Sequence, residues 1–455
     1  MIRVQLLIFL CLSVLQSKSQ ESVITHTYGG AAFEEFRAVQ ALPEGGYVMA
    51  GTTGSQEGSN TDIYLVRSDS LLNCEWSLSL GGEGVDVGRD VTVDANSNIY
   101  VCGFRSGISS EGYDAVVYKI SSEGDIGWEI SLGGNDWDFA NAIDLDATGR
   151  VWMGGSAFQN GIQKPWLTSF NAEGEGNGQW ILPCENSGEI FDVKCTESGI
   201  IVCGYAETES GIRQSVIWYL DSEASVIWQR TEGDGILGRE ATAVDTNGEF
   251  IYVCGRRQTE TFLQAYSQRL DYFGIEQLWS PELHPGDNEY TGIMAADGAF
   301  YSIGRTRGYG FGGYEGFIFR FSDSGGFENG VFYGTENEDA FIDGVLVPGG
   351  FIVCGARQNE EDQWQALVML YRRSVLYSED ISDPEDTACL PTFVEENPES
   401  NSLFGDYSLF DLTGKFIANG RREGDMKWSH MQLGLPTGMY VVKFQSGATL
   451  KLVIY

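Results

Sequence analysis

The sequence predicts an all-β protein whose main part is a seven-bladed β-propeller. A short apolar segment ending in glycine recurs along the 455 residues. Its glycines are Gly51, Gly103, Gly155, Gly204, Gly255, Gly304 and Gly355. Subtracting successive glycine numbers gives steps of 52, 52, 49, 51, 49 and 51 residues. A strand-rich period near 50 residues is typical of propellers. Each unit contains four short apolar segments separated by polar or glycine-rich turns, which is the content of one four-stranded antiparallel blade.

The two ends of the array indicate how the ring closes. Residues 23–30 read like the end of a fourth strand with its Gly-Gly exit, and they precede the first complete unit. The seventh unit has strand-like segments at 351–355 and 365–371 but no clear fourth strand after them. We therefore expect the N-terminal strand to complete the last blade, which would hide both edge strands of the array. The predicted propeller spans residues 20–373.

Residues 1–19 are predicted to be a signal peptide. Arg3 provides the positive charge, residues 4–15 are apolar but too short to span a bilayer, and Ser17 and Ser19 are small residues before the expected cleavage point. No other apolar run approaches membrane-spanning length, so no transmembrane segment is expected. We therefore expect the chain to be exported from the cytoplasm.

Composition excludes some classes of partner. The chain has 28 Lys and Arg against 65 Asp and Glu, a formal net charge of −37. Such a surface repels nucleic acids and anionic membranes, which bind through Lys and Arg. Four of the nine cysteines share one repeat position, and there is no C-x-x-C or zinc spacing, so these four are expected to be small packing residues rather than ligands or disulfides. They are Cys102, Cys203, Cys254 and Cys354.

Two further series recur with the blades. A tryptophan near the fourth strand of five units, namely Trp76, Trp128, Trp180, Trp228 and Trp279, is expected to pack between blades. A carboxylate precedes the innermost strand of every unit: Glu34, Asp86, Asp138, Glu189, Glu240, Glu289 and Asp339. We expect these acids to accept backbone N–H bonds and fix the turns between blades. The alternative is a cation site holding Ca²⁺ or Na⁺, for which Asp86, Asp138 and Asp339 are the candidates. No other cofactor is expected.

Binding is expected where the copies differ. The loop between the second and third strands of the sixth unit is rich in Arg and aromatic residues: Arg305, Arg307, Tyr309, Phe311 and Tyr314. Arg256, Trp364 and Trp137 should face the same way. This pattern favours a non-enzymatic scaffold that binds an extracellular glycan or protein, because loops carry function more often than cores do. A polysaccharide-active hydrolase or lyase, and a structural or adhesive surface component, are the alternatives. With three histidines in the chain, a His-based triad or metal site is hard to build, and no catalytic residue is assigned.

The C-terminal part differs in charge. Residues 374–401 are acidic and contain three prolines, which is typical of an extended linker, whereas residues 402–455 regain Lys and Arg and predict a small β-sandwich. The segment carries Asp411, Gly414 and Lys415, then Leu435, Pro436, Gly438 and Tyr440, then Lys451 in a final apolar strand. In order and spacing these residues resemble the C-terminal sorting domain of type IX secretion substrates in Bacteroidetes. The resemblance implies export, recognition by the type IX secretion machinery, and a final location outside the cell, either released or attached to the outer-membrane surface.

The repeat units are also similar to the bacterial β-propeller repeat family. The match is best around Leu132, Gly133, Gly134, Asp138 and the strand that ends at Gly155. This resemblance implies the fold and does not imply an activity.

Overall fold

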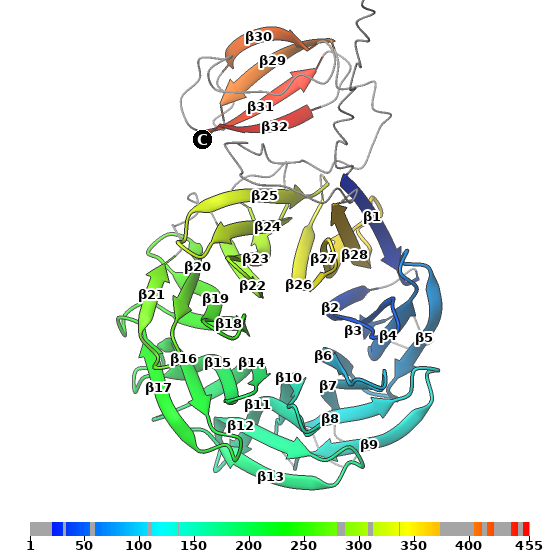
Figure 1. Ribbon diagram of the computed structural model, residues 1–455, viewed down its shortest axis with the longest axis vertical. Coiled ribbons are helices and arrows are strands. Elements are labelled where there is room, and N and C mark those ends of the chain that lie inside the picture. Colours follow the sequence, from blue (N-terminus) through cyan, green and yellow to red (C-terminus); the bar gives the residue numbers. More distant parts are fainter. Residues whose placement is uncertain are drawn as a thin grey trace, which may run out of the picture.

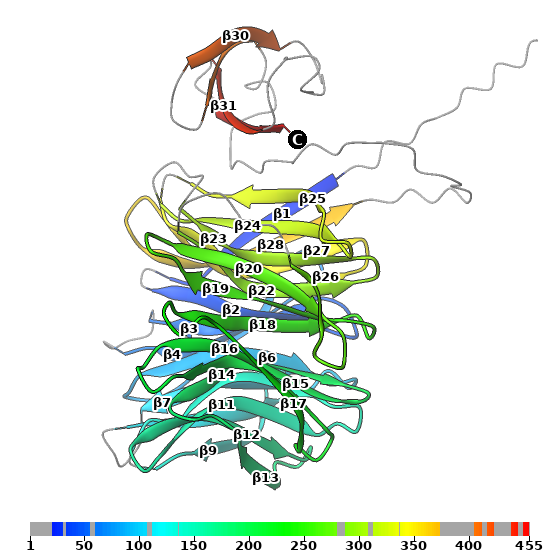
Figure 2. The same cartoon turned by 90° about the vertical axis from the view of Figure 1, so that its left-hand side faces the viewer.

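Seven four-stranded antiparallel sheets surround a central axis (Figure 1). The structure is a computed structural model, and it describes residues 21–30, 33–54, 60–106, 112–134, 136–279, 287–307, 313–335, 337–373, 405–411, 416–422, 438–444 and 449–454. Seen edge-on, the blades form a disc (Figure 2). The predicted seven-bladed propeller is therefore confirmed. In the described part of the chain, no helix is long and apolar enough to cross a membrane.

Each blade runs from an innermost strand near the axis to an outermost strand at the rim. Blades one to three are β2 (Glu34–Ala41), β3 (Tyr47–Thr53), β4 (Asp62–Ser68), β5 (Cys74–Leu80); β6 (Asp86–Val93), β7 (Ile99–Ser106), β8 (Tyr113–Ile120), β9 (Ile126–Leu132); and β10 (Phe139–Leu145), β11 (Val151–Gln159), β12 (Ile162–Phe170), β13 (Gly176–Ile181). Blades four to six are β14 (Gly188–Thr196), β15 (Gly199–Glu207), β16 (Arg213–Leu220), β17 (Val226–Glu232); β18 (Arg239–Thr246), β19 (Ile251–Gln258), β20 (Leu263–Leu270), β21 (Glu276–Trp279); and β22 (Asn288–Ala296), β23 (Ala299–Thr306), β24 (Glu315–Ser322), β25 (Phe327–Tyr333). The seventh blade is β26 (Asp339–Val347), β27 (Gly350–Gln358), β28 (Trp364–Arg373) and β1 (Glu21–Tyr28).

The N-terminal strand closes the ring, as the sequence predicts. Strand β1 pairs with β28 along its whole length, from Glu21 opposite Arg373 to Tyr28 opposite Ala366. Its side chains Val23 and Ile24 pack against two different apolar clusters of the propeller. Backbone pairing between the first and last strands of the propeller thus closes the ring, and neither β28 nor β1 is left as a free inner edge.

The seven repeated glycines have a specific geometric cause. The innermost strand of every blade has a bulge, and the repeated glycine of the second strand lies opposite it. A Cβ built on Gly155 would lie 1.9 Å from the carbonyl oxygen of Phe139, and the same conflict with a neighbouring carbonyl occurs at the other six. The sequence interpretation that each strand ends at its glycine is wrong: β11, for example, continues to Gln159, because the glycine accommodates the bulge and does not terminate the strand.

The tryptophan series packs between blades, but it is not a single register. The indole N–H groups of Trp76, Trp128 and Trp228 donate to carbonyls of the next blade's outer turn, at Ser122, Ala172 and Tyr272. Trp180 instead lies two positions later on its strand, where its ring folds over Gly178 and contacts Trp152 at 5.3 Å between ring centroids. Trp279 lies one position later, opposite Gln268. The expectation of one equivalent position is therefore corrected for two of the five blades.

The cysteines are consistent with the packing interpretation. Cys102, Cys203, Cys254 and Cys354 are fully buried, and every cysteine in the described residues is a free thiol.

The C-terminal segment contributes β29 (Gly405–Asp411), β30 (Phe416–Arg422), β31 (Gly438–Phe444) and β32 (Thr449–Ile454), which pair in the order β30-β29-β31-β32. Gly414, Lys415, Leu435 and Pro436 of the proposed sorting motif lie outside the described residues. The sandwich stays a prediction.

Candidate functional site

The seven carboxylates that precede the innermost strands are committed to local contacts. Asp86 accepts the backbone N–H of Gly82 at 3.1 Å, and Asp138 accepts those of Gly134 and Phe158 at 3.2 and 3.1 Å. Asp339 accepts both the N–H and the hydroxyl of Thr335. Burial raises the pKa of all three side chains, that of Asp339 to about 6. These contacts fit the predicted role of fixing the turns between blades.

The alternative cation site finds no support in the geometry. Within the described ranges, no group of three or more His, Cys, Asp or Glu side chains is placed to hold a metal ion. Glu240 and Glu289 contact arginines instead of turn amides. The ring of acids is therefore not uniform: Asp138 and Asp339 fix turns, Glu240 and Glu289 bind arginines, and Asp86 does both, since it also pairs with Arg105 at 3.4 Å. The repeat pattern does not reveal this difference.

A second set of aspartates, not noticed in the sequence, joins adjacent blades at five of the seven junctions. Asp90, Asp192 and Asp343 lie at the bulges and accept the backbone N–H of Ile143, Val244 and Val39 in the following blade, at 2.8, 2.7 and 3.0 Å. Asp144 and Asp245 make the same kind of bond two residues further along their strands, to Cys195 and Ala295. Burial raises the pKa of Asp192 to about 7 and that of Asp343 to about 6. Their role is structural, since the bonds join adjacent blades.

The predicted binding face contains a continuous chain of contacts that we call the arginine belt: Arg213, Glu240, Arg256, Glu289, Arg305, Tyr314, Arg307 and Glu338. Arg213 Nη1 donates to Glu240 at 2.5 Å, and Arg256 donates to Glu240 at 2.7 Å and to Glu289 at 2.5 Å. Arg305 then donates to the other oxygen of Glu289. The belt therefore crosses from the fourth blade to the sixth through alternating charges.

Tyr314 carries the belt on toward the seventh blade. The guanidinium groups of Arg305 and Arg307 lie over its ring, 4.7 and 4.2 Å from the centroid, which are cation–π distances. Arg307 donates to Glu338 at 2.9 Å, and the N–H of Tyr314 donates to the same carboxylate at 2.8 Å. The predicted grouping of Arg256, Arg305, Arg307 and Tyr314 is thus a set of touching side chains.

The belt exposes its cations and buries two of its three anions, the third being Glu338, which is 28% exposed. The side chains of Arg256, Arg305 and Arg307 are 34, 38 and 51% exposed, whereas those of Glu240 and Glu289 are 9 and 4% exposed. Burial by itself would raise the pKa of Glu289, but Arg305 and Arg256 outweigh it and hold that pKa below its usual value. The two buried carboxylates therefore hold a row of half-exposed guanidinium groups in place from below.

The other predicted site residues lie elsewhere. Trp137 packs against Tyr113 and Phe139 between the second and third blades, and 52% of it is exposed. Trp364 begins β28 in the seventh blade, opposite Gln358. Tyr309 and Phe311 lie outside the described residues. Trp137 contacts residues of the second and third blades, whereas the belt begins at Arg213 on β16 in the fourth blade.

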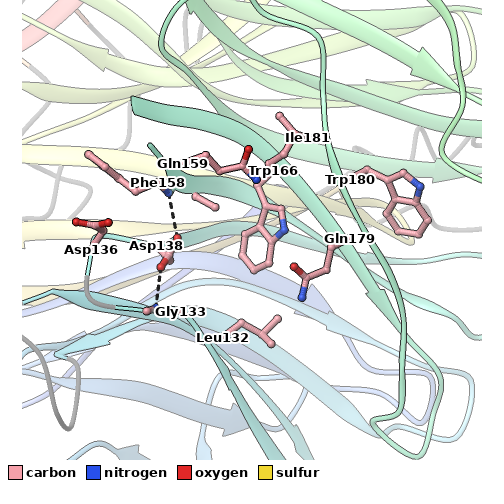
Figure 3. A pocket seen from close by; sticks show the side chains of 12 residues that line it. Leu132, Gly133, Asp136, Asp138, Phe158, Gln159, Trp166, Gln179, Trp180 and Ile181 are labelled. Carbon is pink, nitrogen blue, oxygen red and sulfur yellow. Dashed lines mark hydrogen bonds between the residues drawn. The ribbon is translucent and has the colours of Figure 1, made fainter. Parts of the chain in front are cut away.

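One cavity was not foreseen from the sequence. A pocket of about 530 Å³ lies between the turn that enters the third blade and the outer half of that blade (Figure 3). Trp166, Gln159 and Gln179 line it together with Asp136 and Asp138. In the sequence, Trp166 is the feature that distinguishes this blade from the others. At the equivalent position the other blades carry Tyr64, Val116, Val216, Tyr266, Phe317 and Leu367.

Comparison with known proteins agrees with the fold. Residues 75–103 match the family model described as beta-propeller repeat. These residues run from β5 through the second strand of the second blade, so the match includes the step from one blade to the next. A search of curated proteins found no match.

The chain is similar to several solved structures at very low sequence identity. The chain is similar to polysaccharide lyase Uly1 with a TM-score of 0.50 and 9% identity, over 76% of this chain and 91% of that one. It is also similar to the beta-propeller domain of the Trilobed protease from Pyrococcus furiosus, with a TM-score of 0.46 and 10% identity over 76% and 96% of the two chains. A third is Sqt1 from Chaetomium thermophilum, at 0.44 and 10% over 77% and 100%. At these identities the likeness concerns the fold alone.

Proposed function

We propose that the protein is an exported, non-enzymatic binding scaffold whose arginine belt binds an anionic extracellular glycan. The observation that carries the proposal is the exposure pattern of the belt, in which guanidinium groups face solvent above buried carboxylates. Arginine presents five N–H donors in a fixed fork that matches carboxylate and sulfate groups. A row of such groups spaced over adjacent blades suits a repeating acidic chain better than a single small anion.

The surrounding charge sharpens this choice. The protein has a net charge of −37, so a polyanion is repelled by most of its surface and is attracted where cations are gathered. Tyr314 adds an aromatic ring between two arginines, and sugar rings commonly pack on such surfaces. The belt lacks the pair of opposed catalytic carboxylates that glycoside hydrolysis requires, because Glu240 and Glu289 are both neutralised by arginine.

Replacing Arg307 with glutamine is expected to weaken binding of a polyuronate such as alginate about fivefold. One charge-assisted hydrogen bond to the ligand would be lost, while the largely exposed side chain contributes little to folding. Binding is measured by isothermal titration at several NaCl concentrations, and affinity should fall as salt rises. The matched control is Arg150→Gln, a half-buried arginine on the opposite face whose guanidinium lies over Trp152. Equal binding by Arg307→Gln and the unaltered protein, or failure of alginate, pectate and chondroitin sulfate to bind at all, would contradict the proposal.

Export through the type IX pathway is the second part of the proposal, and the sequence motif of residues 402–455 supports it. Deleting residues 406–455 is expected to leave the protein in the periplasm of its native host, because the secretion machinery would lack its recognition segment. Cell fractionation with surface labelling of intact cells measures this directly. A surface signal from the truncated protein equal to that of the full chain would reject the sorting role without affecting the glycan proposal.

A further inference from the structure

The pocket of the third blade contains a buried polar group that has no protein partner. Trp166, on β12, is only 4% exposed. Among the described residues its indole N–H makes no hydrogen bond, and its nitrogen is not one of the fully enclosed polar atoms without a partner, so it opens onto the pocket. Tryptophans usually satisfy this donor, as the fully buried Trp152 does by donating to Asp146 at 3.1 Å. The N–H of Trp218 also lacks a partner, but it is enclosed and does not open onto a cavity that could hold a ligand. The free N–H of Trp166 therefore points to a partner outside the chain.

Two other polar side chains beside Trp166 also lack a partner among the described residues. The amide side chains of Gln159 and Gln179 are exposed, line the pocket and have no hydrogen-bond partner in the described part of the chain. Figure 3 shows Trp166 at the centre of the cavity, between Asp138 and Gln179. Leu132 and Ile181 supply apolar surface at the rim. An amide both donates and accepts, so the pocket offers donors and acceptors around a partly apolar wall.

Comparison with the first blade shows which features of the pocket recur in another blade and which belong to the third blade. An equivalent cavity of about 500 Å³ lies there, between Gly29, Gly30 and the outer strands. Tyr64 occupies the position of Trp166, because each residue lies opposite the repeated glycine of its blade. Ser77, the counterpart of Gln179, lines that cavity in place of an amide. The cavity is therefore a property of the blade architecture, whereas the unpaired indole and amides belong to the third blade.

We propose that this pocket binds one neutral sugar residue of a saccharide chain. Its volume lies within the range of about 300–1,000 Å³ that is usual for small-molecule sites and accommodates a hexose. A hexose ring presents several hydroxyls, each able to donate and accept, and these match the amides of Gln159 and Gln179 and the N–H of Trp166. The apolar C–H edge of the sugar would contact Leu132 and Ile181.

The charges of the pocket exclude the other simple ligand classes. No Lys or Arg lines it, and Asp136 and Asp138 are both acidic, so an anionic ligand is repelled. A bound cation is equally disfavoured, because both oxygens of Asp138 already accept backbone N–H groups and only the exposed Asp136 remains. The pocket shares no residue with the arginine belt, so this site and its ligand class are independent of the proposed function.

The test is saturation-transfer NMR and isothermal titration of the full chain with cellohexaose, laminarihexaose, mannohexaose and xylohexaose. We expect at least one of these neutral chains to bind, and we expect Gln179→Ala and Gln159→Ala each to weaken that binding about five- to tenfold. Trp166→Phe should weaken it similarly, because the N–H is removed while an aromatic ring is kept. Since Trp166 is buried, the two glutamine variants decide the outcome where the phenylalanine variant is unstable.

The matched control is Gln229→Ala. Gln229 is exposed and occupies in the fourth blade the strand position that Gln179 occupies in the third. This variant should bind as the unaltered protein does. Absence of binding to all four hexasaccharides would overturn the proposal. An equal loss on Gln229→Ala and Gln179→Ala would overturn it too.

Discussion

Replacing Gly155 with alanine is expected to lower the free energy of unfolding by about 3–5 kcal/mol, although only one methyl group is added. The new Cβ would lie 1.9 Å from the Phe139 carbonyl oxygen and 3.0 Å from the Cα of Ala140. Both obstacles are backbone atoms of the bulged strand β10, so relief requires the inner strand to move away from its neighbour. Chemical denaturation followed by tryptophan fluorescence measures the change.

The matched control for this substitution lies in the same blade. Gly176 is also a glycine within a strand, at the start of β13, but nothing lies within 4 Å of a Cβ built on it. Gly176→Ala should change stability by no more than about 0.5 kcal/mol. If the two alanine variants unfold at the same denaturant concentration, the bulge does not explain the seven-fold repetition of glycine.

Removing residues 21–30 is expected to destabilise the propeller by about 4–6 kcal/mol and to make it associate. Val23, Ile24 and Tyr28 would no longer cover the apolar clusters that they pack against, and each such side chain contributes roughly 1.5–3 kcal/mol when fully buried. The deletion also uncovers the hydrogen-bonding edge of β28, which can then pair with other chains. Thermal unfolding and light scattering after size-exclusion chromatography report the two effects.

A synthetic peptide of residues 21–30 provides the control for that deletion. Added in excess, it should occupy the edge of β28 and restore both the monomer and part of the lost thermal stability. A truncated protein that stays monomeric with an unchanged unfolding temperature would show that β1 is not needed for closure.

The number of blades and the manner of closure could be predicted because they depend on residues that every blade must carry. Gly155 and its six counterparts recur because each lies opposite a bulge. The seventh unit has no fourth strand of its own in sequence, and this indicated that β1 completes the last blade. The reason for the glycine was not visible, because a bulge is a relation between two strands. Trp180 shows the same limit: its sequence position resembles that of Trp128, but its register differs by two residues.

The candidate sites could be predicted only in part. Arg256, Arg305 and Tyr314 lie close together because their loops belong to adjacent blades, and their role in binding stays a prediction. The sequence did not reveal that Glu240 and Glu289 hold these arginines, since the same acids seemed equivalent to the turn-fixing Asp86 and Asp138. The pocket of Trp166 was missed because burial and an unpaired N–H are properties of packing, and no spacing or residue pattern encodes them.

The pairing of β1 with β28 also determines when the protein can finish folding. Glu21 is among the first residues of the propeller to be synthesised, and its partner Arg373 is the last. Individual blades can form their local hairpins earlier, but the ring has no final partner for its first strand until the whole array has been made. A chain interrupted anywhere in the seventh blade would therefore keep β1 unpaired. Such a chain would be exposed to association and degradation, so ring closure serves as a check that synthesis of the propeller is complete.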